Sequence, residues 1–273
     1  MRKVHSFLRK IGMIFLILFC VNGSFPVNAE EEVHRPLIQT TTFQEEYEGM
    51  VAFGGVRARI LSKPDMEEAY RNVRTGVVQI DAGSVYGSGV IWEMNEKEII
   101  VISNRHLLQD FNAASRVIFW GGTAAEGELL MLSDTYDLGF VKVDVADVAY
   151  DELTVLKEAG REDTAYRKLK SGDAVFVVGS ADGVGSDWYE GTVGNTWWYI
   201  EDFDAYMLYC FCYGKPGMSG GGTYDAYGNF VGMLTGGTAG NETASIPVNI
   251  ILEEYQSCCL KNQTIESVRK ETG

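Results

Sequence analysis

Short apolar stretches of strand length follow one another through most of the chain. In the first half they predict β-strands at residues 76–80, 88–93, 98–103, 116–120, 126–132 and 138–143. Runs of this kind, rich in Val, Ile and aromatic residues and bounded by turn residues, are typical of strands. Because six such strands follow closely on one another, they predict an antiparallel β-barrel over about residues 75–145.

A second series of apolar stretches begins after a charged connection at residues 146–172. It predicts strands at residues 174–178, 188–193, 197–200, 205–212, 231–235 and 243–246. These strands predict a second barrel over about residues 173–248, followed by a terminal helix over 249–260 that Asn249 would cap. The predicted fold class is therefore all-β, with two six-stranded antiparallel barrels, a C-terminal helix and a polar tail at residues 261–273.

Residues 1–29 have the pattern of a secretory signal peptide. Four basic residues precede an apolar run at 11–21, and a small-residue cleavage site follows. The run is short for a membrane span, so we expect membrane attachment only if the signal stays uncleaved. The mature chain is thus expected to be secreted or held in the cell envelope. Residues 30–74 form an N-terminal arm of unassigned role, in which Asp65 is predicted to cap a helix at 65–73.

The chain is acidic, with 23 Lys and Arg against 38 Asp and Glu and a formal net charge of −15. Such a charge disfavours binding to nucleic acid and to anionic membranes, and it favours basic substrates. The length of 273 residues suits one all-β domain of the two-barrel kind.

Four cysteines follow the predicted signal peptide. Cys210 and Cys212 lie on a predicted strand, and Cys258 and Cys259 on the predicted terminal helix. An even number in an exported chain permits disulfides. Adjacent cysteines pair only with strain, so bridges between the strand and the helix are the expected arrangement, and buried free thiols are the alternative. The spacing matches no zinc pattern, and we expect neither a metal ion nor a cofactor.

The segment Gly217–Gly221, Gly-Met-Ser-Gly-Gly, places a serine between glycines. A tight turn there would expose the Ser219 hydroxyl and let the backbone N–H groups of Gly217 and Ser219 converge beside it. Acyl transfer needs this combination of a nucleophile and an oxyanion hole. Because the chain has 31 glycines, the segment gains meaning only if a base and an orienting acid accompany it.

One histidine and one aspartate are candidates for those two roles. His106 is the only one of three histidines in sequence predicted to fold, and Asp137 begins the apolar run at 138–143. Taken alone, each has a simpler interpretation, as a strand-end histidine bound to a carbonyl group and as a turn aspartate. Together, the chain order His106, Asp137, Ser219 is that of chymotrypsin-type triads.

Six segments extend this pattern, namely Gly87–Ile91, Ser103–His106, Asp137–Val143, Gly217–Gly221, Gly228–Met233 and Ala244–Asn249. In this order they resemble trypsin-like (chymotrypsin-fold) serine peptidases, most closely the bacterial HtrA-type protease domain, over about residues 75–255. The resemblance implies a serine endopeptidase that acts on proteins or peptides without a cofactor. HtrA-type proteases usually carry a PDZ domain. The chain has no room for one after residue 260, so we expect a protease domain alone and leave its oligomeric state open.

The resemblance implies a role for each catalytic candidate. Ser219 would be the nucleophile, His106 the general base and then acid, and Asp137 the group that orients His106. The backbone N–H groups of Gly217 and Ser219 would form the oxyanion hole.

The resemblance also places residues around the triad. Thr235 falls where the family has a hydroxyl that supports the triad aspartate, and Tyr213, Gly236 and Gly237 fall at the substrate pocket. No acidic residue is evident at the pocket floor, so trypsin-like cleavage after Lys or Arg is not favoured.

Two positions depart from the family. Met218 stands where digestive members carry an aspartate that pairs with a newly cut N-terminus, so we do not expect activation by that ion pair. Arg105, beside His106, is unusual and would act on His106 electrostatically or contact substrate. The alternative to a protease is a catalytically weak or inactive module of the same fold that binds peptides or senses the state of the cell envelope.

Overall fold

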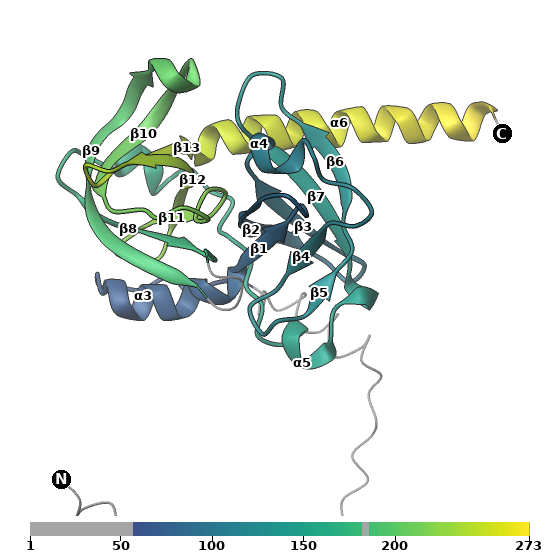
Figure 1. The fold of residues 1–273 in the computed structure, drawn as a ribbon, viewed down its shortest axis with the longest axis horizontal. Helices are drawn as coiled ribbons and strands as arrows, with labels where there is room; N and C mark the ends of the chain where they lie inside the picture. The colour runs from purple at the N-terminus through teal and green to yellow at the C-terminus, as the bar shows by residue number, and fades with distance from the viewer. Residues whose placement is uncertain (1–56, 182–185, 273) are drawn as a thin grey trace, which may run out of the picture. The chain divides into compact units, whose positions relative to one another are not determined.

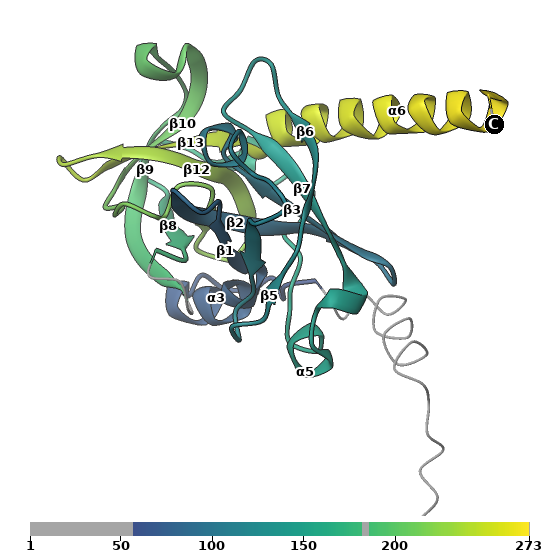
Figure 2. The same ribbon diagram turned by 45° about the vertical axis from the view of Figure 1, so that its right-hand side comes forward.

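The computed structural model describes residues 57–181 and 186–272, with side chains up to residue 260. The predicted signal peptide and the arm up to residue 56 lie outside the described residues. Two antiparallel β-structures lie next to each other, and one long C-terminal helix contacts both (Figures 1 and 2). No helix among the described residues is long and apolar enough to cross a membrane.

The first β-structure is a seven-stranded sheet in the order β5-β4-β1-β2-β3-β7-β6. Its strands are β1 (Val77–Asp81), β2 (Tyr86–Met94), β3 (Glu98–Ser103), β4 (Arg116–Ile118), β5 (Ala124–Ala125), β6 (Glu128–Leu132) and β7 (Gly139–Asp144). All six predicted strands are present, and β5 is additional. The expected six-stranded first barrel is thus corrected to a seven-stranded half-barrel. It stays open because β4 and β5, at one edge, offer only three and two residues for pairing.

Alternate residues of the central strands of this sheet face two different cores. Ile91, Val101 and Val141 belong to the core inside the half-barrel. Trp92 and Phe140 belong to a larger core that the sheet shares with the second β-structure. Successive side chains of a strand point to opposite faces, so strands buried on both faces appear in the sequence as continuous apolar runs.

The second β-structure is a closed six-stranded barrel in the order β10-β13-β12-β11-β8-β9. Its strands are β8 (Ala174–Gly179), β9 (Asp187–Ile200), β10 (Ala205–Cys212), β11 (Gly222–Asp225), β12 (Phe230–Thr238) and β13 (Glu242–Pro247). The predicted strands at 188–193 and 197–200 are one strand, β9, which continues past an irregularity at Gly194. The unpredicted β11 follows the Ser219 loop, and all four of its residues are buried. The all-β architecture is confirmed.

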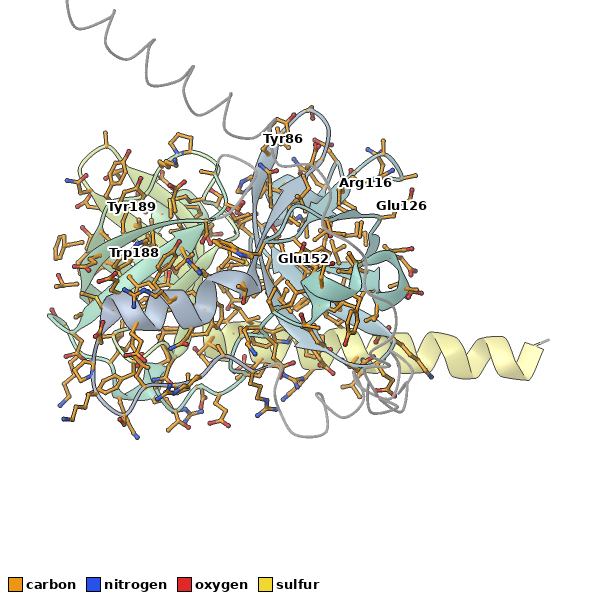
Figure 3. All side chains as sticks on the ribbon, turned by 90° about the horizontal axis from the view of Figure 1, so that it is seen from below. Tyr86, Arg116, Glu126, Glu152, Trp188 and Tyr189 are labelled. Atoms are coloured by element: carbon orange, nitrogen blue, oxygen red, sulfur yellow. The ribbon has the colours of Figure 1, made fainter. Side chains whose placement is uncertain are left out.

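The helices are α3 (Met66–Val73), α4 (Arg105–Leu108), α5 (Tyr150–Leu153) and α6 (Val248–Thr272), with 3₁₀ turns η1 (Arg74–Gly76), η2 (Val145–Asp147), η3 (Tyr166–Lys168) and η4 (Glu201–Phe203). As predicted, Asp65 caps α3, because its carboxylate accepts a 3.0 Å hydrogen bond from the Glu68 N–H. The ring of Tyr70 on α3 stacks on Trp188 of β9 with centroids 5.0 Å apart. Figure 3 shows Trp188 on the side of the second barrel along which α3 lies. The last part of the predicted arm therefore packs on the second barrel.

The C-terminal helix begins directly after β13 and passes along the first sheet (Figure 1). There the ring of Tyr255 lies 6.0 Å from that of Trp92 and 5.4 Å from that of Phe140, between centroids. The helix is longer than the predicted 249–260. It continues to Thr272, so the predicted polar tail is helical.

None of the four described cysteines takes part in a disulfide. The expected disulfides between β10 and α6 are therefore wrong. The alternative of buried thiols outside disulfides is confirmed for Cys210, Cys212 and Cys258, whereas Cys259 is half-buried. Cys210 and Cys212 are buried in the core of the second barrel. This burial raises the pKa of Cys210 to about 12 and that of Cys212 to about 11. Both thiols are protonated at neutral pH, the form that reacts poorly.

Candidate active site

The loop that carries Ser219 connects β10 to β11 through two glycines in the left-handed region. Gly217 has a φ of +91° and Gly220 a φ of +89°, which other residues rarely adopt. A Cβ atom on Gly220 would also lie 2.0 Å from the carbonyl oxygen of Ser88. Met218 is fully buried, whereas Ser219 is only partly buried. The turn thus places Met218 in the core and leaves its neighbour nearer the surface.

Ser88, on β2, holds this loop from the first sheet. Its N–H donates to the carbonyl of Ser219 at 2.7 Å, and its hydroxyl donates to the carbonyl of Gly217 at 2.7 Å. The same hydroxyl accepts a 2.8 Å hydrogen bond from the Ser180 N–H, and the Ser88 carbonyl accepts one of 2.6 Å from the Ser103 hydroxyl. These bonds link both β-structures at the point where the Ser219 loop lies.

His106 lies in the single turn of α4, three residues after Ser103, and is held by Asp137 at two points. Its backbone N–H donates to Oδ1 of Asp137 at 2.8 Å, and its ring Nδ1 lies 2.7 Å from Oδ2. Because an ionised carboxylate only accepts hydrogen bonds, Nδ1 carries a proton, and Nε2 of the neutral ring keeps its lone pair. The His106 side chain is 47% exposed. The pair is therefore arranged as an oriented base that a substrate can reach.

Asn104, two residues before His106, is fully buried beneath this pair. Its Nδ2 donates to the main-chain carbonyl of Asp137 at 2.9 Å and to the Thr235 hydroxyl at 3.3 Å. An asparagine at a helix N-cap commonly caps the helix with its side chain, but no such bond occurs here. The carboxylate of Asp137 caps the start of α4 instead, because it accepts from the His106 N–H. The Asn104 amide links Asp137 to Thr235 of β12.

The candidate oxyanion-hole donors lie on the Ser219 loop, which Ser88 holds. Among the described residues, the N–H groups of Gly217 and Ser219 donate to no backbone carbonyl. Within the same residues, no hydrogen bond joins the Ser219 hydroxyl to His106. The structure thus brings His106 and Asp137 into direct contact. Ser219 lies across the junction between the first sheet and the second barrel, on the loop that Ser88 holds. In unliganded enzymes, catalytic hydrogen bonds are often long and shorten only in the substrate complex.

A cavity of about 610 Å³ opens beside Ser219. Tyr213, Gly236 and Gly237, the three predicted pocket residues, all line it. The ring of Tyr213 packs edge-on against Tyr189, with centroids 4.6 Å apart. None of the described lining residues is acidic, in agreement with the sequence. The cavity therefore has room for a side chain but no described carboxylate to pair with Lys or Arg.

A family model for trypsin-like peptidase domains matches residues 87–233, more than half of the chain. The chain belongs to the trypsin-like peptidase family. The matched segment includes His106, Asp137 and Ser219 but ends before Gly236 and Gly237. Among curated proteins, no sequence matches.

The trypsin-like peptidase is also similar to a solved structure of the HtrA-type protease AlgW with a decapeptide. The TM-score is 0.60 at 19% sequence identity, and the match covers 71% of this chain and 67% of AlgW. At this identity the likeness concerns the fold. It confirms the all-β chymotrypsin-like fold and the resemblance to HtrA-type domains.

Two predicted neighbours of the candidate triad, Thr235 and Arg105, have defined contacts in the structure. In this trypsin-like peptidase, the Thr235 hydroxyl accepts from Asn104 and donates to the Met233 carbonyl at 3.4 Å, so it meets Asp137 only through Asn104. Arg105 donates through its guanidinium to the carbonyl of Ser133. That bond holds the Arg105 side chain on the loop before Asp137.

Sequence reasoning missed Ser88 and Asn104. Both lie in quoted segments, Gly87–Ile91 and Ser103–His106, but only as matches to the family. The available signal was a polar residue at the end of an apolar run, because Ser88 comes just before residues 90–92 and Asn104 follows residues 99–102. A polar group that is buried there needs a partner. Among the described residues, no group of three or more His, Cys, Asp or Glu is placed to hold a metal ion.

Proposed function

We propose that this trypsin-like peptidase is a serine endopeptidase that uses Ser219, His106 and Asp137. The observation that carries the proposal is the two-point hold of His106 by Asp137, at 2.8 and 2.7 Å. A merely structural histidine needs one partner. Here the carboxylate orients both the backbone and the ring of His106, which is what a general base requires.

The reaction follows from this arrangement. Nε2 of His106 removes the proton from the Ser219 hydroxyl as Oγ attacks the scissile carbonyl carbon. The electron pair of the C=O bond moves onto oxygen, and the N–H groups of Gly217 and Ser219 stabilise that charge. The imidazolium of His106 then protonates the amide nitrogen, and the C–N bond breaks to leave an acyl-enzyme. Asp137 stays ionised throughout.

Hydrolysis of the acyl-enzyme reverses these roles. His106 removes a proton from water as the water oxygen attacks the ester carbon. The bond to Oγ then breaks, and His106 returns the proton to Ser219. The chain supplies every group in this cycle, so the proposal needs no cofactor.

The substrate is a protein or peptide in extended conformation. Gly236–Thr238, at the end of β12, pairs with β13 on one side, whereas β11 pairs only with earlier residues of β12. Within residues 57–181 and 186–272, the other edge of this segment pairs with no strand, and it is available to a peptide strand beside Ser219. The AlgW structure with its decapeptide is consistent with a peptide substrate for this fold. The predicted signal peptide supports an enzyme that works outside the cell or in its envelope.

A second candidate function is peptide binding without turnover. The observation that favours it is that no hydrogen bond joins Ser219 to His106 within the described residues. We favour catalysis because a peptide-binding module would not need a histidine that a carboxylate holds at both its backbone and its ring.

Cleavage of a peptide library distinguishes the two functions. Wild type should produce fragments detectable by mass spectrometry, and Ser219→Ala should produce none. Ser257→Ala is the matched control because Ser257 is exposed on α6, where its hydroxyl bonds only to Glu253 of the same helix. Equal cleavage by all three proteins, or by none while all remain folded, would reject the proposed function.

A further inference from the structure

The loop that carries the proposed nucleophile begins with a β-turn. The Met218 N–H donates to the Lys215 carbonyl at 3.2 Å. Pro216 and Gly217 are therefore the two central residues of the turn. Proline fixes a negative φ at the first central position. Gly217, at the second, has a φ of +91°. This combination belongs to a type II turn.

The type of this turn decides where the Gly217 N–H points. Turns of types I and II differ in the orientation of their central peptide group, and a change from one to the other leaves the ends of the turn in place. Glycine tolerates the φ of either type. In the type II form seen here, the Gly217 N–H donates to no backbone carbonyl among the described residues, so a ligand can accept from it. The proposed oxyanion hole therefore depends on contacts that keep the turn in this form.

Lys215, the first residue of the turn, is held by its side chain and by its backbone. Its Nζ lies 2.7 Å from Oδ2 of Asp187, at the start of β9. The two side chains are 24% and 37% exposed, so solvent screens this ion pair less than one on the open surface. The Lys215 N–H also points at Sδ of Met218, at 3.5 Å. Lys215 thus ties the start of the turn to the second barrel.

The turn rests on the strand pair to which Asp187 belongs. Asp187 lies opposite Gly179 of β8 in the ladder of the second barrel. Met218 packs on that glycine, because a Cβ atom on Gly179 would lie 2.7 Å from both Cα and Cβ of Met218. A Cβ atom on Gly217 would likewise lie 3.0 Å from Cα of Ala181, just after β8. A shift at the start of β9 would therefore reach the turn through the ion pair and through this packing.

Helix α3 of the N-terminal arm contacts both neighbours of Asp187. The Tyr70 hydroxyl donates to the carbonyl of Ser186 at 2.9 Å, and the Tyr70 ring stacks on Trp188 at an angle of 11° between the ring planes. The helix lies along the second barrel (Figure 1), and its Ala69 is fully buried in the core. Tyr70 thus fixes the backbone on either side of the carboxylate that holds Lys215.

We propose that Lys215 and Asp187 position the oxyanion hole, and that α3 supports them through Tyr70. This inference rests on the proposed function, because the position of the Gly217 N–H affects turnover only if the chain cleaves by acyl transfer. It gives the last part of the N-terminal arm a role in activity. Lys215, Asp187 and Tyr70 are positioning residues, since none of them needs to touch the substrate.

Kinetics of Lys215→Met and Asp187→Asn on one fluorogenic peptide test the ion pair. The oxyanion hole stabilises charge that develops in the transition state, so both variants should lower kcat and leave KM nearly unchanged. We expect a fall of about three- to fivefold in kcat, the upper part of the range for a partly exposed ion pair. Because Asp187 acts through Lys215, the double variant should be no slower than Lys215→Met alone.

Tyr70→Phe tests the support from α3. It removes the hydroxyl bond to β9 but keeps the ring, and it should lower kcat by about twofold. Tyr166→Phe is the matched control, because the Tyr166 hydroxyl donates to the carbonyl of Thr196, farther along β9, at 2.7 Å. Lys142→Met is the control for the ion pair, because Lys142 pairs with Glu128 on the first sheet at the same 2.7 Å. Both controls should keep wild-type kcat, and thermal unfolding should show that every variant is folded.

The outcomes separate this inference from the proposed function. Wild-type kcat in folded Lys215→Met and Asp187→Asn, or losses that add in the double variant, would overturn the inference alone. Absence of any cleavage by folded wild type would overturn the proposed function, and the ¹H–¹⁵N NMR signal of the Gly217 amide then decides whether the pair positions the turn. A shift of that signal in Lys215→Met and Asp187→Asn, absent in Lys142→Met, supports it, and an unchanged signal rejects it.

Discussion

The hydroxyl of Ser88 donates a 2.7 Å hydrogen bond to the main-chain carbonyl of Gly217, across the junction between the first sheet and the loop that carries Ser219. This bond fixes the Gly217–Met218 peptide while the N–H of Gly217, on the other side of the same residue, stays without a backbone acceptor among the described residues. Gly217 adopts a left-handed φ of +91° in this same turn. Ser88 therefore acts as a positioning residue for the proposed oxyanion hole.

Replacing Ser88 by alanine should lower kcat with little change in KM. The change leaves the Gly217 carbonyl and the Ser180 N–H without a partner, each at a cost of about 1–3 kcal/mol in the free energy of unfolding. Steady-state kinetics and thermal unfolding measure both effects. The control is Ser115→Ala, because Ser115 is equally buried, at 1% exposure, and its hydroxyl accepts from the Asn112 N–H instead. Wild-type kcat in Ser88→Ala would contradict this role.

Asp137→Asn should reduce kcat by about 10⁴-fold while the protein remains folded. An asparagine at this position keeps the size of the side chain but no longer selects the tautomer of His106 in which Nε2 is free, and a loss of about 10⁴-fold follows from that change in serine proteases. Active-site titration and circular dichroism distinguish lost chemistry from lost folding. Full activity of a folded Asp137→Asn would exclude Asp137 as the orienting group.

The hydrogen bonds from Tyr209 and Thr238 to Glu242 should make the stability of the folded protein depend on pH in the acid range. The bond from Tyr209, and then that from Thr238, lowers the pKa of Glu242 below its ordinary value of 4.5. Because the folded-state pKa is the lower one, the stabilisation is present above about pH 4.5 and is lost as pH falls through the folded-state value. Wild type should lose more Tm than Glu242→Gln between about pH 6 and pH 3. Parallel Tm profiles would contradict the prediction.

The thiols of Cys210 and Cys212 should resist modification in the folded protein. Burial raises the pKa of both, to about 12 and about 11, so the reactive thiolate is scarce at neutral pH. Alkylation followed by peptide mass spectrometry should label them only after denaturation, and a reductant should leave Tm unchanged. A fall in Tm on reduction would show a disulfide and contradict the free-thiol assignment.

Much of the fold follows from the apolar pattern, and the departures have local causes. Strand β3, for example, is a continuous apolar run because both of its faces are buried. β11 was missed because its sequence, Gly-Thr-Tyr-Asp, contains two residues that are rare in strands, and closure of the barrel overrides that preference. β9 was divided because Gly194 and Asn195 resemble a turn, whereas the strand passes through them with an irregular register.

The candidate site was likewise only partly predictable from the sequence. The contact between His106 and Asp137 was predictable, because a carboxylate at the start of a buried strand needs a partner and His106 is the only histidine nearby in the predicted fold. The parts played by Ser88 and Asn104 were not predictable from local sequence. Their bonds join residues 129 and 131 positions apart and exist only once the two β-structures meet.

Covalent labelling by a fluorophosphonate probe tests the central claim most directly, because such probes react with an activated serine. Wild type and Ser257→Ala should be labelled, and Ser219→Ala and His106→Ala should not. Peptide mapping should place the adduct on Ser219. A folded wild-type protein that stays unlabelled, or equal labelling of Ser219→Ala, would contradict the assignment of Ser219 as a nucleophile activated by His106.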